Sequence, residues 1–166
     1  MKPLLIIFTL LLSCQFAWSQ NPQIITIRKL YNEFQNNKSS STQNKIDDFE
    51  NSSEGGEITA YYLNDSIKMI ETKYYGHMGK TYEEYYFDRG KLYFVFSQDF
   101  QYNAPPTEEE YKDNETVVSA NRKYFWNQDL IRWIGPDGTE LDSSSTEYMA
   151  EESFLVKYAN SLLKKF

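Results

Sequence analysis

The sequence predicts an α+β fold in which an antiparallel β-meander of about six strands packs with an N-terminal and a C-terminal helix. Apolar residues recur at helical spacing in residues 24–34 and again in residues 148–166. Between these stripes, an aromatic-rich strand end followed by an Asn or Asp turn occurs three times, in residues 61–64, 85–88 and 124–127. A further apolar run follows each copy, which predicts three β-hairpins.

The first helix is predicted to begin at Asn21 and Pro22, because Asn is a favoured N-cap and Pro is favoured at the first helical position. We expect it to end near residues 35–37. Residues 36–56 are rich in Asn, Ser and Gly, and this composition indicates a mobile surface linker.

Strand-type periodicity begins at Glu57. The six predicted strands are residues 58–63, 67–75, 81–87, 92–97, 116–126 and 130–134. Residues 99–116 contain two successive prolines and three successive glutamates, and they are predicted to form a long loop. The C-terminal helix is expected to be capped by Ser144, Ser145 or Thr146.

The rings of the three repeated segments are the candidate binding residues. They are Tyr61, Tyr62, Tyr85, Tyr86, Tyr124, Phe125 and Trp126. Since neighbouring strand residues point to opposite faces, the rings of each copy are divided between the two faces of the sheet. Either the helices cover most of these rings, or one face stays open for a ligand. We favour the first interpretation because most rings in a domain of this size are core or rim.

The residue pattern indicates no assembled catalytic or metal-binding site. His77 is the only histidine and falls in a predicted hairpin loop, so it is interpreted as an exposed loop residue. Glu83 and Glu84 are adjacent on a strand, and they therefore cannot flank one substrate bond together. Carboxylates that tertiary contacts could bring to either of them are Glu57, Glu71 and Asp99. We expect no enzyme activity, no cofactor and no metal.

Residues 1–19 have the pattern of a secretory signal peptide, with an early Lys2, an apolar run and cleavage between Ser19 and Gln20. The apolar run is too short to cross a bilayer, which takes about 20 residues, and no transmembrane segment is expected. Cys14 lies in a degenerate lipoprotein cleavage box, so a lipid anchor there is the less favoured alternative. We expect an exported protein, periplasmic or extracellular, with residues 20–166 as a single domain.

The charge balance argues against nucleic acid as a partner. Removal of Lys2 with the signal peptide leaves 16 basic residues against 24 acidic ones, a net charge of −8. Phosphate backbones require clustered Lys and Arg, which an acidic domain of this composition does not supply. The expected partner is instead a protein or glycan of the cell envelope.

The segment Phe87-Asp88-Arg89-Gly90-Lys91-Leu92 resembles the hairpins of MORN-type repeat proteins. The resemblance covers residues 57–134 and departs from a regular array, because the turns at Asn64, Asp88 and Asn127 are separated by 24 and then 39 residues. The chain also resembles small exported bacterial proteins with a helix–meander–helix layout. Neither resemblance implies catalytic residues.

Together these observations favour a non-enzymatic exported protein with a binding or interaction role. The alternative is a hydrolase of envelope glycan or peptide that uses carboxylates from separate strands.

Overall fold

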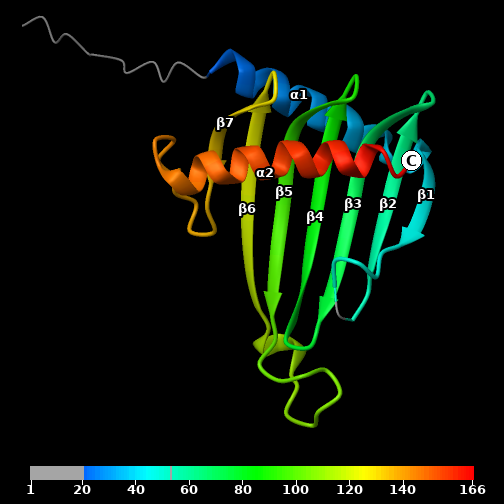
Figure 1. Cartoon of the computed structure of the whole chain (residues 1–166), viewed down its shortest axis with the longest axis vertical. Helices are drawn as coiled ribbons and strands as arrows, with labels where there is room; N and C mark the ends of the chain where they lie inside the picture. Colours follow the sequence, from blue (N-terminus) through cyan, green and yellow to red (C-terminus); the bar gives the residue numbers. More distant parts are fainter. Residues whose placement is uncertain (1–20, 53) are drawn as a thin grey trace, which may run out of the picture.

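Seven strands form a single antiparallel sheet in which each strand lies beside the next one in the sequence (Figure 1). The computed structural model describes residues 21–52 and 54–166. The strands are β1 (Thr42–Asp47), β2 (Gly56–Leu63), β3 (Ser66–Gly76), β4 (Gly79–Asp88), β5 (Lys91–Gln101), β6 (Val117–Trp126) and β7 (Asp129–Ile134). The helices are α1 (Pro22–Asn37) and α2 (Thr146–Leu163), with short 3-10 helices at Lys38–Ser40 and Asp113–Glu115. The predicted signal peptide, its cleavage site at Ser19 and Gln20, and Cys14 lie outside the described residues.

The two helices pack on opposite faces of the sheet, so the fold has three layers. In Figure 1, α2 crosses the front of the sheet and α1 lies behind it. One apolar cluster, with Tyr85 and Phe125, forms between the sheet and α2. A second cluster, with Tyr86 and Phe94, forms between the sheet and α1. The predicted α+β meander with a helix at each end is therefore confirmed.

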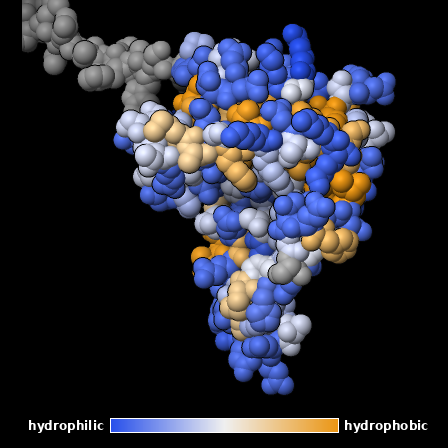
Figure 2. All heavy atoms as spheres, viewed as in Figure 1, coloured by the Kyte–Doolittle hydropathy of each residue, from blue (hydrophilic) through white to orange (hydrophobic). Residues whose placement is uncertain are grey.

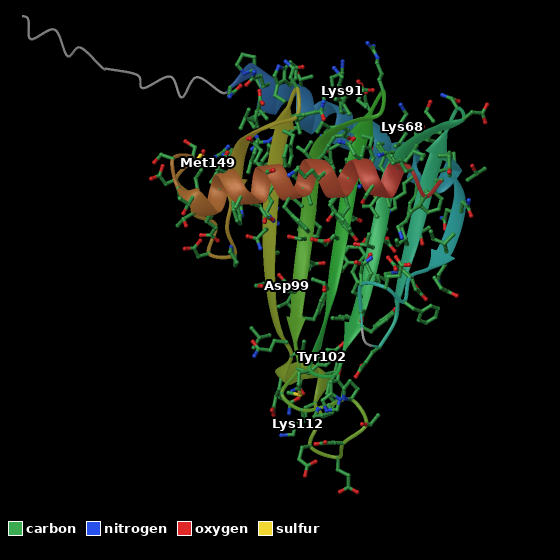
Figure 3. The ribbon with its side chains drawn as sticks, viewed as in Figure 1. Lys68, Lys91, Asp99, Tyr102, Lys112 and Met149 are labelled. Carbon is green, nitrogen blue, oxygen red and sulfur yellow. The ribbon has the colours of Figure 1, made fainter. Side chains whose placement is uncertain are left out.

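Both helices cross near the end of the sheet that carries the β2–β3, β4–β5 and β6–β7 turns (Figure 1). We call this the tip end. The β3–β4 turn and the loop of residues 102–116 lie at the opposite end, which we call the far end. Figure 3 shows the same division, with Lys68 and Lys91 at the tip end and Tyr102 and Lys112 at the far end.

The three tip turns share one backbone geometry, which explains the repeated Asn and Asp residues. Positive φ angles occur at both central positions of each turn: Asn64 and Asp65, Arg89 and Gly90, and Asn127 and Gln128. Two successive positive φ angles are the mark of the type I′ turn, which favours Asn, Asp and Gly. The pairing register also shifts beside each aromatic pair, at Tyr61/Tyr62, Tyr86/Phe87 and Tyr124/Phe125. The three hairpins are therefore built alike down to the position of the bulge.

The sheet has seven strands rather than the predicted six, because β1 lies inside the segment predicted as a linker. β1 pairs antiparallel with β2 from Thr42 to Asp47. Ile46 packs against the α2-side cluster, whereas the other five residues of the strand are exposed. An edge strand needs only one hydrogen-bonded neighbour, so a polar sequence can form it. The segment after β1 is held by Asp48, whose carboxylate accepts hydrogen bonds from Asn51 and Tyr74.

The helix boundaries agree closely with the predicted caps. Asn21 accepts a hydrogen bond from the Gln23 amide at 2.9 Å, and Ser145 accepts one from the Tyr148 amide at 3.1 Å. The long loop begins later than predicted, because β5 continues to Gln101 through pairing with both neighbouring strands. Among the described residues, no helix combines the length and apolar character needed to cross a membrane.

Candidate functional site

Most of the predicted binding rings are core residues. Tyr61, Tyr85, Tyr86, Tyr124 and Phe125 are buried, and the two helices divide them between the two clusters. Tyr62 and Trp126 are half-buried. The opposite orientation of neighbouring rings is as predicted, with Tyr85 toward α2 and Tyr86 toward α1. Because the helices cover these rings, only the two half-buried ones remain as candidates to contact a ligand.

Tyr62 lines a cleft of about 580 Å³ at the tip end. The cleft lies between the C-terminal half of α1 and the β2–β3 and β4–β5 turns, and we call it the tip cleft. Its apolar walls come from Leu30, Phe34, Tyr62, Leu63, Phe87 and Tyr93. Its polar lining is Glu33, Asn37, Ser40, Thr42, Asn64, Asp65, Lys68 and Asp88. Two of the three repeated turns therefore contribute directly to one site.

The tip cleft carries three carboxylates, from Glu33, Asp65 and Asp88, against one ammonium group, from Lys68. Two of these carboxylates have only weak partners. Glu33 pairs with the exposed Lys29 at 3.8 Å, and Asp88 pairs with its exposed neighbour Arg89 at 3.9 Å. Ion pairs of this kind contribute about 0–1 kcal/mol. The carboxylates therefore remain available to a positively charged ligand.

Two structural features hold the polar lining in place. Asp65 occupies the second central position of a type I′ turn, with φ of 58°. The turn backbone therefore fixes the direction of its Cα–Cβ bond. On the opposite turn, burial and then the Asp88 carboxylate raise the pKa of the Tyr93 phenol well above its usual value. The Tyr93 hydroxyl is protonated at neutral pH, as an ordinary phenol also is, and it can donate a hydrogen bond to a ligand.

A second candidate is a pair of carboxylates on the α1 face. Glu71 of β3 lies directly opposite Glu84 of β4. The Tyr82 hydroxyl lies between them, 2.9 Å from Glu71 and 2.6 Å from Glu84. Burial alone would raise the pKa of Glu71, but hydrogen bonds from Lys73 and Tyr82 bring it below the ordinary value. A general acid needs the opposite shift, and Tyr82 fills the space a substrate bond would need.

Glu83 points to the opposite face, as predicted. Its carboxylate accepts a hydrogen bond from Tyr85 at 2.7 Å. Burial raises the pKa of Glu83, and the Asp99 carboxylate adds to that rise. Figure 3 shows Asp99 on the α2 side of the sheet, beyond the edge of that helix. The third carboxylate considered as a partner, Glu57, pairs instead with Lys45 at 2.7 Å.

His77 lies in the β3–β4 turn and is exposed, as predicted. Its Nδ1 lies 3.6 Å from a carboxylate oxygen of Glu54. Within residues 21–52 and 54–166, no three His, Cys, Asp or Glu side chains are placed to hold a metal ion.

Comparisons with protein-family models, with curated proteins and with solved structures find nothing that matches this chain. Sequence reasoning identified Tyr62 but missed Glu33, Asp65, Lys68 and Tyr93. A usable signal was present, because Asp65 and Asp88 stand at the turns of successive hairpins, which the meander brings to the same end of the sheet.

Proposed function

We propose that this chain is an exported, non-enzymatic binding protein, that its ligand site is the tip cleft, and that the ligand carries an amino group. The observation that supports this most strongly is the combination of a 580 Å³ cleft with three carboxylates against one ammonium group. Small-molecule sites commonly occupy about 300–1,000 Å³ and combine apolar walls with a few converging polar groups.

The lining supplies the contacts that an ammonium group needs. Carboxylates of Asp65 and Asp88 accept charge-assisted hydrogen bonds, which are about twice as strong as neutral ones. Tyr93, which belongs to the α1-side cluster, adds an aromatic ring to the lining, and aromatic rings attract cations. Lys68 provides a donor for a hydroxyl or carboxylate elsewhere on the same ligand. An amino sugar or an amino-terminal peptide fragment of the envelope has this combination of groups.

The test is titration calorimetry with glucosamine and with N-acetylglucosamine, which differ in the charge of one nitrogen. Glucosamine is expected to bind more tightly, and Asp65→Asn and Asp88→Asn are each expected to weaken it by about tenfold. Asp129→Asn is the matched control, because it removes an exposed carboxylate beside the third tip turn, outside the cleft. Equal affinity for the two sugars, or no binding of either at millimolar concentration, would refute the proposal.

The runner-up proposal is a glycan hydrolase on the α2 face, and one observation favours it. Glu83 and Asp99 occupy diagonal positions on β4 and β5, since Glu83 pairs with Ser97. Diagonal positions are about 7–8 Å apart at the backbone, so the two side chains can reach the roughly 6.5–9.5 Å that separates the carboxyl groups of inverting glycosidases. The raised pKa of Glu83 suits a general acid.

Release of reducing sugar from purified envelope glycan distinguishes the two proposals. Hydrolysis that is abolished by Glu83→Gln and by Asp99→Asn would establish the enzyme. Absence of turnover by the unmodified protein would reject it and leave the binding proposal standing.

A further inference from the structure

The α1 face carries a second concave surface at its far end, away from the tip cleft. Side chains on this face stand in rows across β3, β4, β5 and β6, as the strand pairing dictates. The row nearest the tip is Met69, Tyr86, Phe94 and Tyr124, and α1 covers it. The next three rows toward the far end are Glu71, Glu84, Phe96 and Arg122; Lys73, Tyr82, Gln98 and Ala120; and Tyr75, Lys80, Phe100 and Val118. We call these three rows the platform.

The platform is hollowed in two places. One hollow of about 310 Å³ is lined by Tyr75, Lys80, Tyr82, Gln98 and Phe100, among others. Another, of about 390 Å³, includes Phe96 and Arg122 and extends to the side of α1. Three rows span about 13 Å along the strands, and four strands span about 14 Å across them. The surface is therefore long enough for an extended ligand.

Cations of the platform lie on its rings. Lys80 Nζ is 4.6 Å from the centre of the Phe100 ring, and the Arg122 guanidinium is 5.5 Å from the Phe96 ring. Within the described part of the chain, neither cation has a carboxylate within 4.0 Å, although ten such pairs occur elsewhere. Lys73, by contrast, is bound to Glu71 at 2.7 Å. Two cations are therefore left for an anionic ligand in a chain of net charge −7.

We propose that the platform binds an extended polysaccharide that carries carboxylate groups. The exposed ring of Tyr75 contacts the apolar faces of sugars, the Gln98 amide hydrogen-bonds hydroxyls, and Lys80 and Arg122 bind the carboxylates. This site is independent of the tip cleft and of its proposed ligand.

The geometry favours a polysaccharide over other extended partners. A peptide cannot add to the sheet here, because β3 to β6 are each paired on both sides. Lys80 and Arg122 stand two rows and two strands apart, which corresponds to about 16 Å between their backbones. A nucleic acid carries a phosphate every 3.4 Å or so along a duplex strand, so several charges would lie between the two cations without a partner. A saccharide with a charge on every second sugar places fewer unpaired charges between the two cations.

Affinity is to be measured with a hyaluronan hexasaccharide, which has a carboxylate on every second sugar, and with the neutral hexamer of N-acetylglucosamine. A ten-residue oligothymidylate and vesicles of phosphatidylcholine with phosphatidylglycerol test the competing partners. The hyaluronan hexamer is expected to bind at least about tenfold more tightly than the other three.

Lys80→Gln and Arg122→Gln should each weaken the hyaluronan complex by about tenfold. Lys91→Gln is the matched control, since it removes an exposed lysine at the tip end (Figure 3). Far-UV circular dichroism verifies that each variant is folded. Equal binding of the neutral hexamer, tighter binding of the oligonucleotide or the vesicles, or an equal effect of Lys91→Gln overturns the proposal. Unchanged binding in Asp65→Asn separates this site from the tip cleft.

Discussion

Glu84→Gln is expected to stabilise the protein at pH 7, because the hydrogen-bond network around Glu84 has one donor fewer than its acceptors can use. The Tyr82 hydroxyl lies within hydrogen-bond distance of both Glu71 and Glu84. Burial, and then Glu84 itself, raise the pKa of Tyr82 far above its usual value, so this phenol carries its single proton. That proton can serve only one of the two carboxylates.

A glutamine at position 84 supplies the missing donor. Its amide can donate to the Tyr82 oxygen while Tyr82 donates to Glu71, and its carbonyl can still accept from Tyr86, which lies 2.6 Å from the Glu84 carboxylate. One added hydrogen bond contributes about 0.5–1.5 kcal/mol. The change also removes the 3.6 Å ion pair with Lys38, a partly exposed contact that contributes about 0–1 kcal/mol. The expected net gain is about 0.5 kcal/mol.

Urea unfolding at pH 7, followed by tryptophan fluorescence, measures this gain. Glu84→Ala is the contrasting variant, since it leaves the buried Tyr86 hydroxyl without an acceptor and should cost about 1–3 kcal/mol. A double-mutant cycle with Tyr82→Phe isolates the energy of the new hydrogen bond, because the glutamine amide then has no hydroxyl oxygen to donate to. A Glu84→Gln variant as unstable as Glu84→Ala would contradict the missing hydrogen-bond donor. A gain that persists in full without the Tyr82 hydroxyl would also contradict it and would assign the gain to relief of charge repulsion.

Three further variants test the core, the buried acid and the far end. Burial raises the folded pKa of Glu83 above its ordinary 4.5, so its contribution to stability is full below that value and is lost as the pH rises. Glu83→Gln should therefore gain stability over the parent between about pH 5 and pH 8, and an equal difference at low pH would contradict this. Phe125→Ala should lose about 3–5 kcal/mol by urea unfolding, since the ring is fully buried; a loss below about 1 kcal/mol would show that the core collapses. Gly79→Ala should lose about 1–3 kcal/mol, because its new methyl group would overlap the Phe100 backbone carbonyl, and unchanged hydrogen exchange in the β3–β4 turn would disprove the clash.

The sequence predicted the hairpins well because the turn geometry restricts the residues that can occupy it. Positive φ at successive positions favours Asn, Asp and Gly, and Asn64-Asp65 therefore marks a turn without knowledge of anything distant. β1 left no such mark, since its residues are mostly polar and its pairing with β2 supplies the only reason for it to be a strand. The burial of Tyr85 and Tyr86 was predictable as a tendency, whereas which helix covers each ring was not.

Beyond Tyr62 and the turn residues Asp65 and Asp88, the candidate sites could not be predicted from the sequence, because the rest of each site depends on packing and register. Glu33 and Asp88 belong to distant segments and line one cleft only because α1 packs across the tips of the hairpins. The platform was missed for a related reason. Its rings, such as Tyr82 and Phe100, stand between polar strand residues and resemble an ordinary wet face until the pairing aligns them in rows.

The length of the strands supports a functional purpose for the far end. A helix with its side chains is about 10–12 Å wide, so a helix that crosses a sheet covers roughly three residues of each strand. β3 and β5 each have 11 residues, so most of each strand extends beyond the helices. That extension adds backbone ordering cost of about 1–2 kcal/mol per residue without a helix to pack on. The far-end surface holds rings under cations and a tyrosine between two carboxylates, rather than an apolar core. A sheet that served only to pack two helices would not need this length. We therefore infer that the surface of the far end has a function.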